Sequence, residues 1–89
     1  MNYLQKINEL IAQNCISEAI NLLTEKIEET PDDELYFMRG KLFWRMGEPR
    51  KAINDYNAAL SLNSDSPARV ALEQANKILD FYNTDLYNP

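Results

Sequence analysis

The chain contains no histidine, only two glycines, one cysteine and no long apolar run. Without histidine, the commonest general base and metal ligand are missing, and no Ser–His or Cys–His pair can form. Two glycines cannot build a glycine-rich phosphate loop, and the acidic pairs lack the alternate-position spacing of a calcium loop. The sequence therefore predicts no enzyme, no catalytic residues, no metal site and no cofactor.

The single cysteine and the net charge narrow the setting and the partners. Cys15 excludes an intramolecular disulfide and is typical of a reducing compartment. The sequence has no apolar run long enough to predict a transmembrane helix, and its amphipathic first residues do not resemble a signal peptide. We therefore expect a cytoplasmic protein. A net charge of −5 argues against nucleic acid and against anionic membrane surfaces as partners.

The composition is that of a globular, all-helical domain. The 89 residues suffice for one core and leave no room for a second domain. Apolar residues recur at three- and four-residue spacing, which is typical of amphipathic helices. The few glycines and prolines lie near the expected element ends, in agreement with an all-α fold.

Residues 33–66 predict two antiparallel helices joined by a tight turn. Gly40 follows Tyr36 by four residues and precedes Phe43 by three, while Ala52 and Tyr56 lie four residues apart beyond the turn. Gly40 and Ala52 remove side-chain bulk where two helices would cross. The three aromatic residues would fill the space around that crossing.

The turn within residues 33–66 has its own signals. Gly47 supplies a positive φ that ends the first helix, and Pro49 suits the first position of the second helix. The turn signals and the aromatic and small residues together span about 34 residues, the length of one repeat. This pattern resembles the tetratricopeptide repeat (TPR) family. The alternative is an unrelated amphipathic helical hairpin.

Residues 1–32 resemble a divergent first repeat that is one residue shorter. The clearest internal echo pairs Glu18-Ala19-Ile20-Asn21 with Lys51-Ala52-Ile53-Asn54. Ile7 departs from the family pattern, because a small residue is expected there, and so does Lys26. The expected boundary residues are Asn2 as a cap, Asn14 as a left-handed turn residue, Ser17 as the second cap and Pro31 as the stop.

Ser66 and Pro67 predict the start of a further helix over residues 67–81. This segment resembles the first helix of a third repeat and would cap the stack. Residues 82–89 form an aromatic tail that we do not expect to be helical, and which either frays or docks on this chain or another. The resemblance thus implies one domain over residues 1–89, with two TPR hairpins and a capping helix as five antiparallel helices in a right-handed superhelix.

In the TPR family, the first helices of successive repeats line a concave groove that holds peptides or partner helices. Phe37 and Trp44 would give their helix a second apolar face, which is covered either by a partner or by neighbouring parts of the chain. The resemblance implies no carboxylate-clamp role, because only Asn8 fits the clamp of such TPR proteins. Leu4, Phe37 and Ala71 or Leu72 occupy the positions where the clamp has cations and amides. The groove positions that the resemblance implies are Leu4, Asn8, Ile11, Phe37, Lys41, Trp44, Arg45, Leu72, Asn76 and Leu79.

The resemblance implies a non-catalytic protein–protein interaction module, an adaptor or scaffold. Its partner would be a protein or peptide with an apolar or aromatic segment, and Lys41 and Arg45 could pair with an acidic residue in that segment. The alternative is a self-associating structural protein, such as a homodimer, whose groove is filled by its own C-terminal tail or by a second copy. Small-ligand binding or catalysis in the groove is the least favoured hypothesis.

Overall fold

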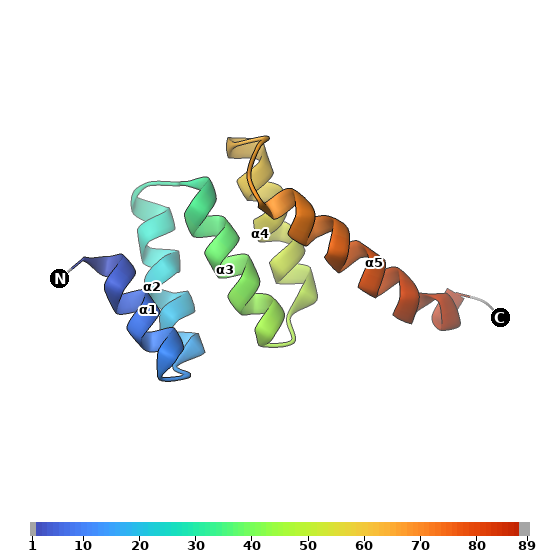
Figure 1. The fold of residues 1–89 in the computed structure, drawn as a ribbon, viewed down its shortest axis with the longest axis horizontal. Coiled ribbons are helices and arrows are strands. Elements are labelled where there is room, and N and C mark those ends of the chain that lie inside the picture. Colours follow the sequence, from blue (N-terminus) through green and yellow to red (C-terminus); the bar gives the residue numbers. More distant parts are fainter. Residues whose placement is uncertain (1, 88–89) are drawn as a thin grey trace.

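The computed structural model describes the backbone of residues 2–87 and the side chains of residues 2–81. Consecutive helices alternate in direction and form two hairpins followed by a last helix (Figure 1). This arrangement confirms the predicted all-α fold of helical hairpins. The helices of the described part are α1 (Tyr3–Ala12), α2 (Ile16–Glu29), α3 (Asp33–Arg45), α4 (Pro49–Leu62) and α5 (Ala68–Tyr87).

Most of the expected boundary residues act as predicted. The Asn2 side chain accepts a hydrogen bond from the Leu4 backbone N–H at 2.7 Å, which caps α1. Asn14 and Gly47 adopt positive φ values of 62° and 78° in the two hairpin turns. Pro49 is the first residue of α4, where its fixed φ suits a helix start.

Two boundary predictions are corrected. Ser17 was expected to cap the second helix, but α2 begins at Ile16, so Ser17 lies inside it. The turn closes early, because the Cys15 N–H donates to the Leu10 carbonyl at 2.7 Å and the chain re-enters a helix at once. Near the C-terminus, α5 runs to Tyr87 rather than ending at residue 81, since the next helix-breaking residue is Pro89. Whether the side chains of 82–89 dock lies outside the described residues.

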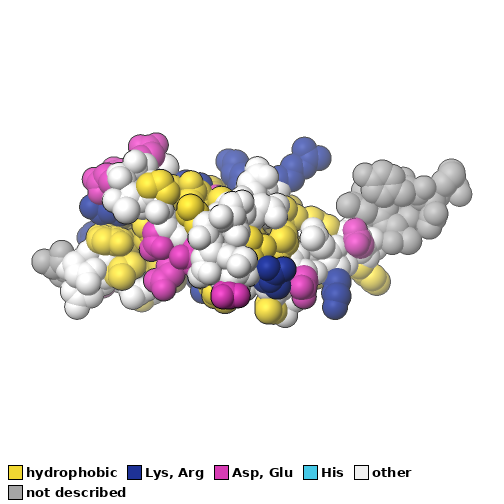
Figure 2. All heavy atoms as spheres, turned by 90° about the horizontal axis from the view of Figure 1, so that it is seen from above, with side chains coloured by type: hydrophobic (Ala, Val, Ile, Leu, Met, Phe, Trp, Pro, Cys, Tyr) yellow, Lys and Arg dark blue, Asp and Glu magenta, His cyan; other side chains and the backbone are white. Residues whose placement is uncertain are grey.

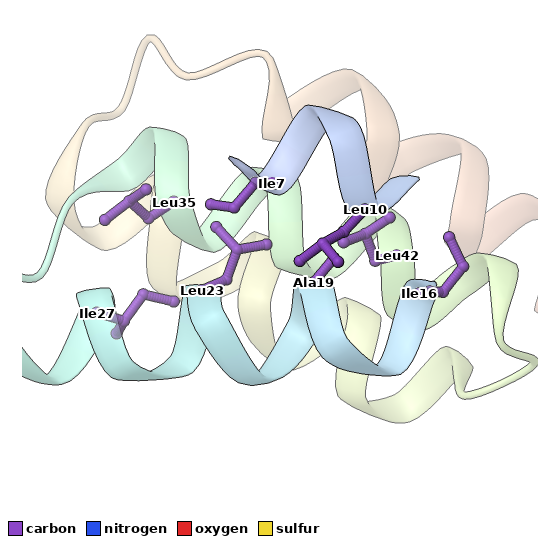
Figure 3. Close-up of a cluster of buried hydrophobic side chains, with 8 residues drawn as sticks. All are labelled: Ile7, Leu10, Ile16, Ala19, Leu23, Ile27, Leu35 and Leu42. Atoms are coloured by element: carbon purple, nitrogen blue, oxygen red, sulfur yellow. The ribbon is translucent and has the colours of Figure 1, made fainter. Parts of the chain in front are cut away.

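The first core cluster fills the space between α1, α2 and α3 (Figure 3). Ile7 and Leu23 are fully buried in this cluster. They occupy the positions that correspond to Gly40 and Tyr56 in the second hairpin, where a small residue faces an aromatic one. At this crossing a larger residue on the first helix thus meets a smaller one on the second, the reverse of the second hairpin. The cluster consists of Ile7, Leu10, Ile16, Ala19, Leu23, Ile27, Leu35 and Leu42.

The second core cluster joins α4 to α5 and is built mainly from alanines. Small side chains allow the two helices to approach closely, and partly buried aromatic residues from α3 pack against the same cluster. Gly40 sits at the α3–α4 crossing, where a Cβ would lie 2.7 Å from Tyr56 Cε1 and 3.2 Å from the Ala52 carbonyl oxygen. The buried members are Ala52, Tyr56, Ala59, Ala68 and Ala75.

A partly buried polar network, which the sequence pattern did not indicate, ties the two hairpins together. Arg39 of α3 donates from Nε and Nη2 to both oxygens of Asp55 on α4, at 2.8 and 2.7 Å. Its Nη1 donates to Thr24 Oγ1 on α2 at 3.1 Å, and Thr24 in turn donates to the Ile20 carbonyl. Asp55 is only 4% exposed and the Arg39 side chain 18% exposed, so the bidentate pair is partly buried. The hydrogen bond to Asp55 raises the pKa of Arg39.

Candidate functional site

A hollow of about 240 Å³ lies between α1 and α3, which we call the α1–α3 hollow. α1 supplies one amide and one aliphatic side chain, and α3 supplies two apolar side chains and two cations. These side chains meet because residues at three- and four-residue spacing share one face of a helix. The lining residues are Asn8, Ile11, Met38, Lys41, Leu42 and Arg45.

A second hollow, of about 200 Å³, lies between α3 and α5 with Tyr56 of α4 beneath it, and we call it the α3–α5 hollow. Its wall combines the chain's one tryptophan with an amide, an isoleucine and two alanines of α5. Lys41 borders both hollows, which therefore adjoin across α3. We name the two hollows together the Lys41 face. The second hollow is lined by Lys41, Trp44, Tyr56, Ala71, Gln74, Ala75 and Ile78.

The Lys41 face differs in charge from the chain as a whole. None of the described residues that line the two hollows is acidic, although the chain carries a net charge of −5. Lys41 and Arg45 are exposed, and neither forms an ion pair within the part of the chain that the structure describes. Lys41 Nζ lies 4.6 Å from the centroid of the Phe37 ring. The face therefore combines apolar hollows with two cations that remain available to a carboxylate.

Trp44 and Phe37 have different surroundings despite their shared helix face. Both are half-buried and pack against the second core cluster. Trp44 also borders the α3–α5 hollow, whereas Phe37 packs on Tyr56 with ring centroids 6.1 Å apart. The side chains around them thus cover both residues in part, and Trp44 lines one of the two hollows of the Lys41 face while Phe37 lines neither.

The structure brings five of the sequence-predicted groove residues to the Lys41 face, namely Asn8, Ile11, Lys41, Trp44 and Arg45. The others lie elsewhere. Leu4 packs against the first core cluster, as Leu72 does against the second. Asn76 is exposed and Leu79 half-buried, and neither borders the two hollows.

Sequence reasoning did not place the α5 wall of the hollow. The helical pattern suggested Leu72, Asn76 and Leu79 for the groove, whereas Ala71, Ala75 and Ile78 line it, together with Gln74. Compared with the prediction, α5 is therefore rotated about its own axis by one residue, and the close packing of its alanines on α4 sets this rotation. The signal that could have indicated it is the run of small residues Ala68, Ala71 and Ala75, which marks the closest approach to a neighbouring helix.

The chemistry of the Lys41 face is that of a binding surface. It offers apolar contacts, two cations, two amides and the Tyr56 phenol, whose pKa is raised first by burial and then by the nearby charge of Asp55. Among the described residues, no group of three or more potential ligands could hold a metal ion. In the same part of the chain, every helix is too short or too polar to cross a membrane.

Comparisons with known proteins agree with this architecture. A family model described as "Tetratricopeptide repeat" matches residues 33–66, which contain the α3–α4 hairpin. The solution NMR structure of the Bacteroides fragilis protein BF1650 is 41% identical in sequence, with a TM-score of 0.84 over 99% of this chain and 91% of that one. No curated protein matches the chain. With a repeat at its centre and such a relative along nearly its full length, the chain belongs to the tetratricopeptide repeat family.

Proposed function

We propose that the chain is a non-catalytic adaptor or scaffold that binds a peptide or helix of another protein on the Lys41 face. TPR repeats generally mediate protein–protein interactions, and the family is typically non-enzymatic. The observation that carries the proposal is the charge of this face, where two adjoining hollows have cations and no acidic residue in their linings. A partner segment with apolar or aromatic side chains and at least one carboxylate complements such a surface.

The two hollows suggest how such a segment would lie. They flank α3, so side chains that enter both would be separated by about one helix diameter, roughly 10 Å. That distance corresponds to about three residues of an extended peptide or about seven of a helix. A carboxylate between the two side chains would meet Lys41 and Arg45, and Trp44 would supply the aromatic contact that often dominates binding energy.

We retain Asn8, Ile11, Lys41, Trp44 and Arg45 as the direct binding residues. Phe37 has a supporting role in this proposal, because its ring lies beneath the Lys41 ammonium group. A cytoplasmic location fits the single cysteine. Nucleic acids and anionic membranes are unfavourable partners for a chain of this net charge.

A charge-reversal pair tests the proposal. Lys41→Glu/Arg45→Glu should abolish capture of specific proteins from native lysate, because the face would repel an acidic segment. Lys6→Glu/Arg50→Glu is the matched control, since it changes the net charge equally at exposed positions outside both hollows. Trp44 is the chain's one tryptophan, so its fluorescence should change as synthetic peptides from a captured protein are titrated in.

Each arm of this experiment has a clear reading. Proteins retained by the intact chain and the control, but lost with Lys41→Glu/Arg45→Glu, would support binding on the Lys41 face. An identical set captured by all three forms would place binding elsewhere. Circular dichroism should show equal helix content in the three forms, because all four substituted side chains are exposed.

A further inference from the structure

The last helix presents an exposed apolar face. Val70, Ile78 and Phe81 of α5 are 57%, 43% and 75% exposed, and they rank among the most exposed large hydrophobic residues described. With 3.6 residues per turn, they lie within roughly 80° of the helix circumference. Gln74, also exposed, falls between them. We call Val70, Gln74, Ile78 and Phe81 the α5 stripe.

The α5 stripe does not face α4. Ala68 and Ala75, the buried residues through which α5 packs on α4, lie about a third of a turn away from the stripe. α5 also runs past the end of α4, away from the two hairpins (Figure 1). Toward that end of the molecule, acidic, basic and hydrophobic side chains follow one another on the surface (Figure 2). An amphipathic helix with an exposed apolar stripe is a typical site of association.

Two charges beside the stripe indicate which partner fits it. Glu73 and Lys77 flank the stripe on the side away from α4, and each lies two residues from Ala75. They have the spacing of an intrahelical pair, yet within the part of the chain that the structure describes neither forms an ion pair. If two α5 helices pack antiparallel through their stripes, with the two-fold axis at the height of Ala75, Glu73 of each copy faces Lys77 of the other. The charge pattern is thus complementary to itself, as a two-fold interface requires.

The apolar residues obey the same symmetry. With the two-fold axis at the height of Ala75, a residue five positions before Ala75 lies opposite the residue five positions after it in the second copy. Val70 therefore lies opposite position 80, in the gap between Ile78 and Phe81 of the second helix. Ile78 falls opposite position 72, between Val70 and Gln74 of the second copy. Val70, Gln74 and Ile78 therefore each enter a gap in the opposite stripe, as in the knobs-into-holes arrangement of paired helices, and Phe81 lies beside Val70 at the end of the opposite stripe.

We propose that the protein forms a symmetric dimer in which the α5 stripes of two copies pack antiparallel, closed by two reciprocal Glu73–Lys77 ion pairs. The paired segment from Val70 to Phe81 is about 18 Å long, shorter than a standard stable interface. The dimer is accordingly weak, with a dissociation constant in the micromolar range or above. Because Gln74 and Ile78 also line the α3–α5 hollow, the dimer narrows access to the Lys41 face.

Sedimentation equilibrium of the full chain, over about 1 to 500 µM, tests this dimer. The intact protein should show a mass that rises with concentration. Glu73→Lys and Lys77→Glu should each raise the dissociation constant by about tenfold or more, since each variant replaces two attractive pairs with two repulsive ones. Lys6→Glu, on α1, is the charge-matched control for Lys77→Glu and should leave the dissociation constant unchanged.

Mixing gives the decisive result. Glu73→Lys carries two cations beside the stripe and Lys77→Glu carries two anions, so the two variants should form a heterodimer although each alone is mostly monomeric. The double variant Glu73→Lys/Lys77→Glu should dimerise as the intact chain does, because its charges have only exchanged places. A monomeric intact chain at every concentration, or a mixture without heterodimer, would overturn the proposal. Either result would leave partner binding on the Lys41 face unaffected, so the two proposals fail separately.

Discussion

Replacing Gly40 by alanine should destabilise the protein, although alanine is the better helix former. A Cβ at this position would lie 2.7 and 2.9 Å from two ring carbons of Tyr56 and 3.2 Å from the Ala52 carbonyl oxygen. The ring cannot swing into solvent, because Tyr56 is 4% exposed, and the carbonyl belongs to the backbone of α4. The methyl group therefore forces α3 and α4 apart.

The expected magnitude follows from two opposing contributions. Overpacking a well-filled crossing costs about 1–3 kcal/mol, whereas glycine to alanine inside a helix contributes about 1 kcal/mol of stability. Because a buried ring and a backbone carbonyl both crowd the added Cβ, we expect the upper part of the overpacking range, about 2–3 kcal/mol, and hence a net loss of roughly 1–2 kcal/mol. For a domain of this size, that loss lowers the melting temperature by roughly 4–15 °C.

Thermal and urea unfolding, followed by circular dichroism, would measure this loss. Gly47→Ala is the comparison, because Gly47 has a φ of 78° and nothing within 4 Å of an added Cβ. Its cost should come from backbone strain alone, about 1 kcal/mol, with the helix crossing intact. A Gly40→Ala protein that melts at or above the temperature of the parent would refute the close crossing at Gly40.

Two further predictions concern the interior. Arg39→Met should cost about 3 kcal/mol in urea unfolding, because it leaves the buried carboxylate of Asp55 unpaired. Arg39→Met/Asp55→Leu should recover most of that loss, and no recovery would contradict the ion-pair explanation. Burial, and secondarily Asp55, raises the pKa of Tyr56 above its ordinary value of 10.0. The folded state thus keeps this phenol protonated to higher pH than the unfolded chain, and the stabilisation is lost as the pH rises through the folded-state pKa. Between about pH 9 and 11, the unfolding free energy should fall less steeply for Tyr56→Phe than for the parent, and equal slopes would exclude this role of Tyr56.

Much of the fold could be predicted because its signals are local. Positive φ at Asn14 and Gly47 and the helix start at Pro49 follow from the conformational preferences of single residues. The helices follow from apolar periodicity along each segment. Ser17 was misplaced as a cap because a difference of one or two residues at a helix end depends on the closure of the neighbouring turn.

The candidate site was only partly predictable, because a hollow requires residues from several helices. Lys41, Trp44 and Arg45 were found since they share a face of α3 with a clear repeat pattern. The residues predicted for the α5 wall were each one position away from those that line the hollow. The Arg39–Asp55 pair left no periodic pattern in the sequence, because its residues are 16 apart in the chain and belong to different helices.

The sequence by itself determined the helices, their turns and the small residues at which they cross, since these depend on interactions within a few residues. Tertiary structure decided how each helix is rotated toward its neighbours, which settles which side chains meet. In the folded protein, Asp55 is buried against Arg39, and α5 is rotated so that Ile78 lines a hollow. Ile7 and Leu23 occupy, in the first hairpin, the positions that Gly40 and Tyr56 occupy in the second. Packing governs these choices, because the side chains of neighbouring helices must together fill each crossing without voids or clashes, a condition that no single segment can meet alone.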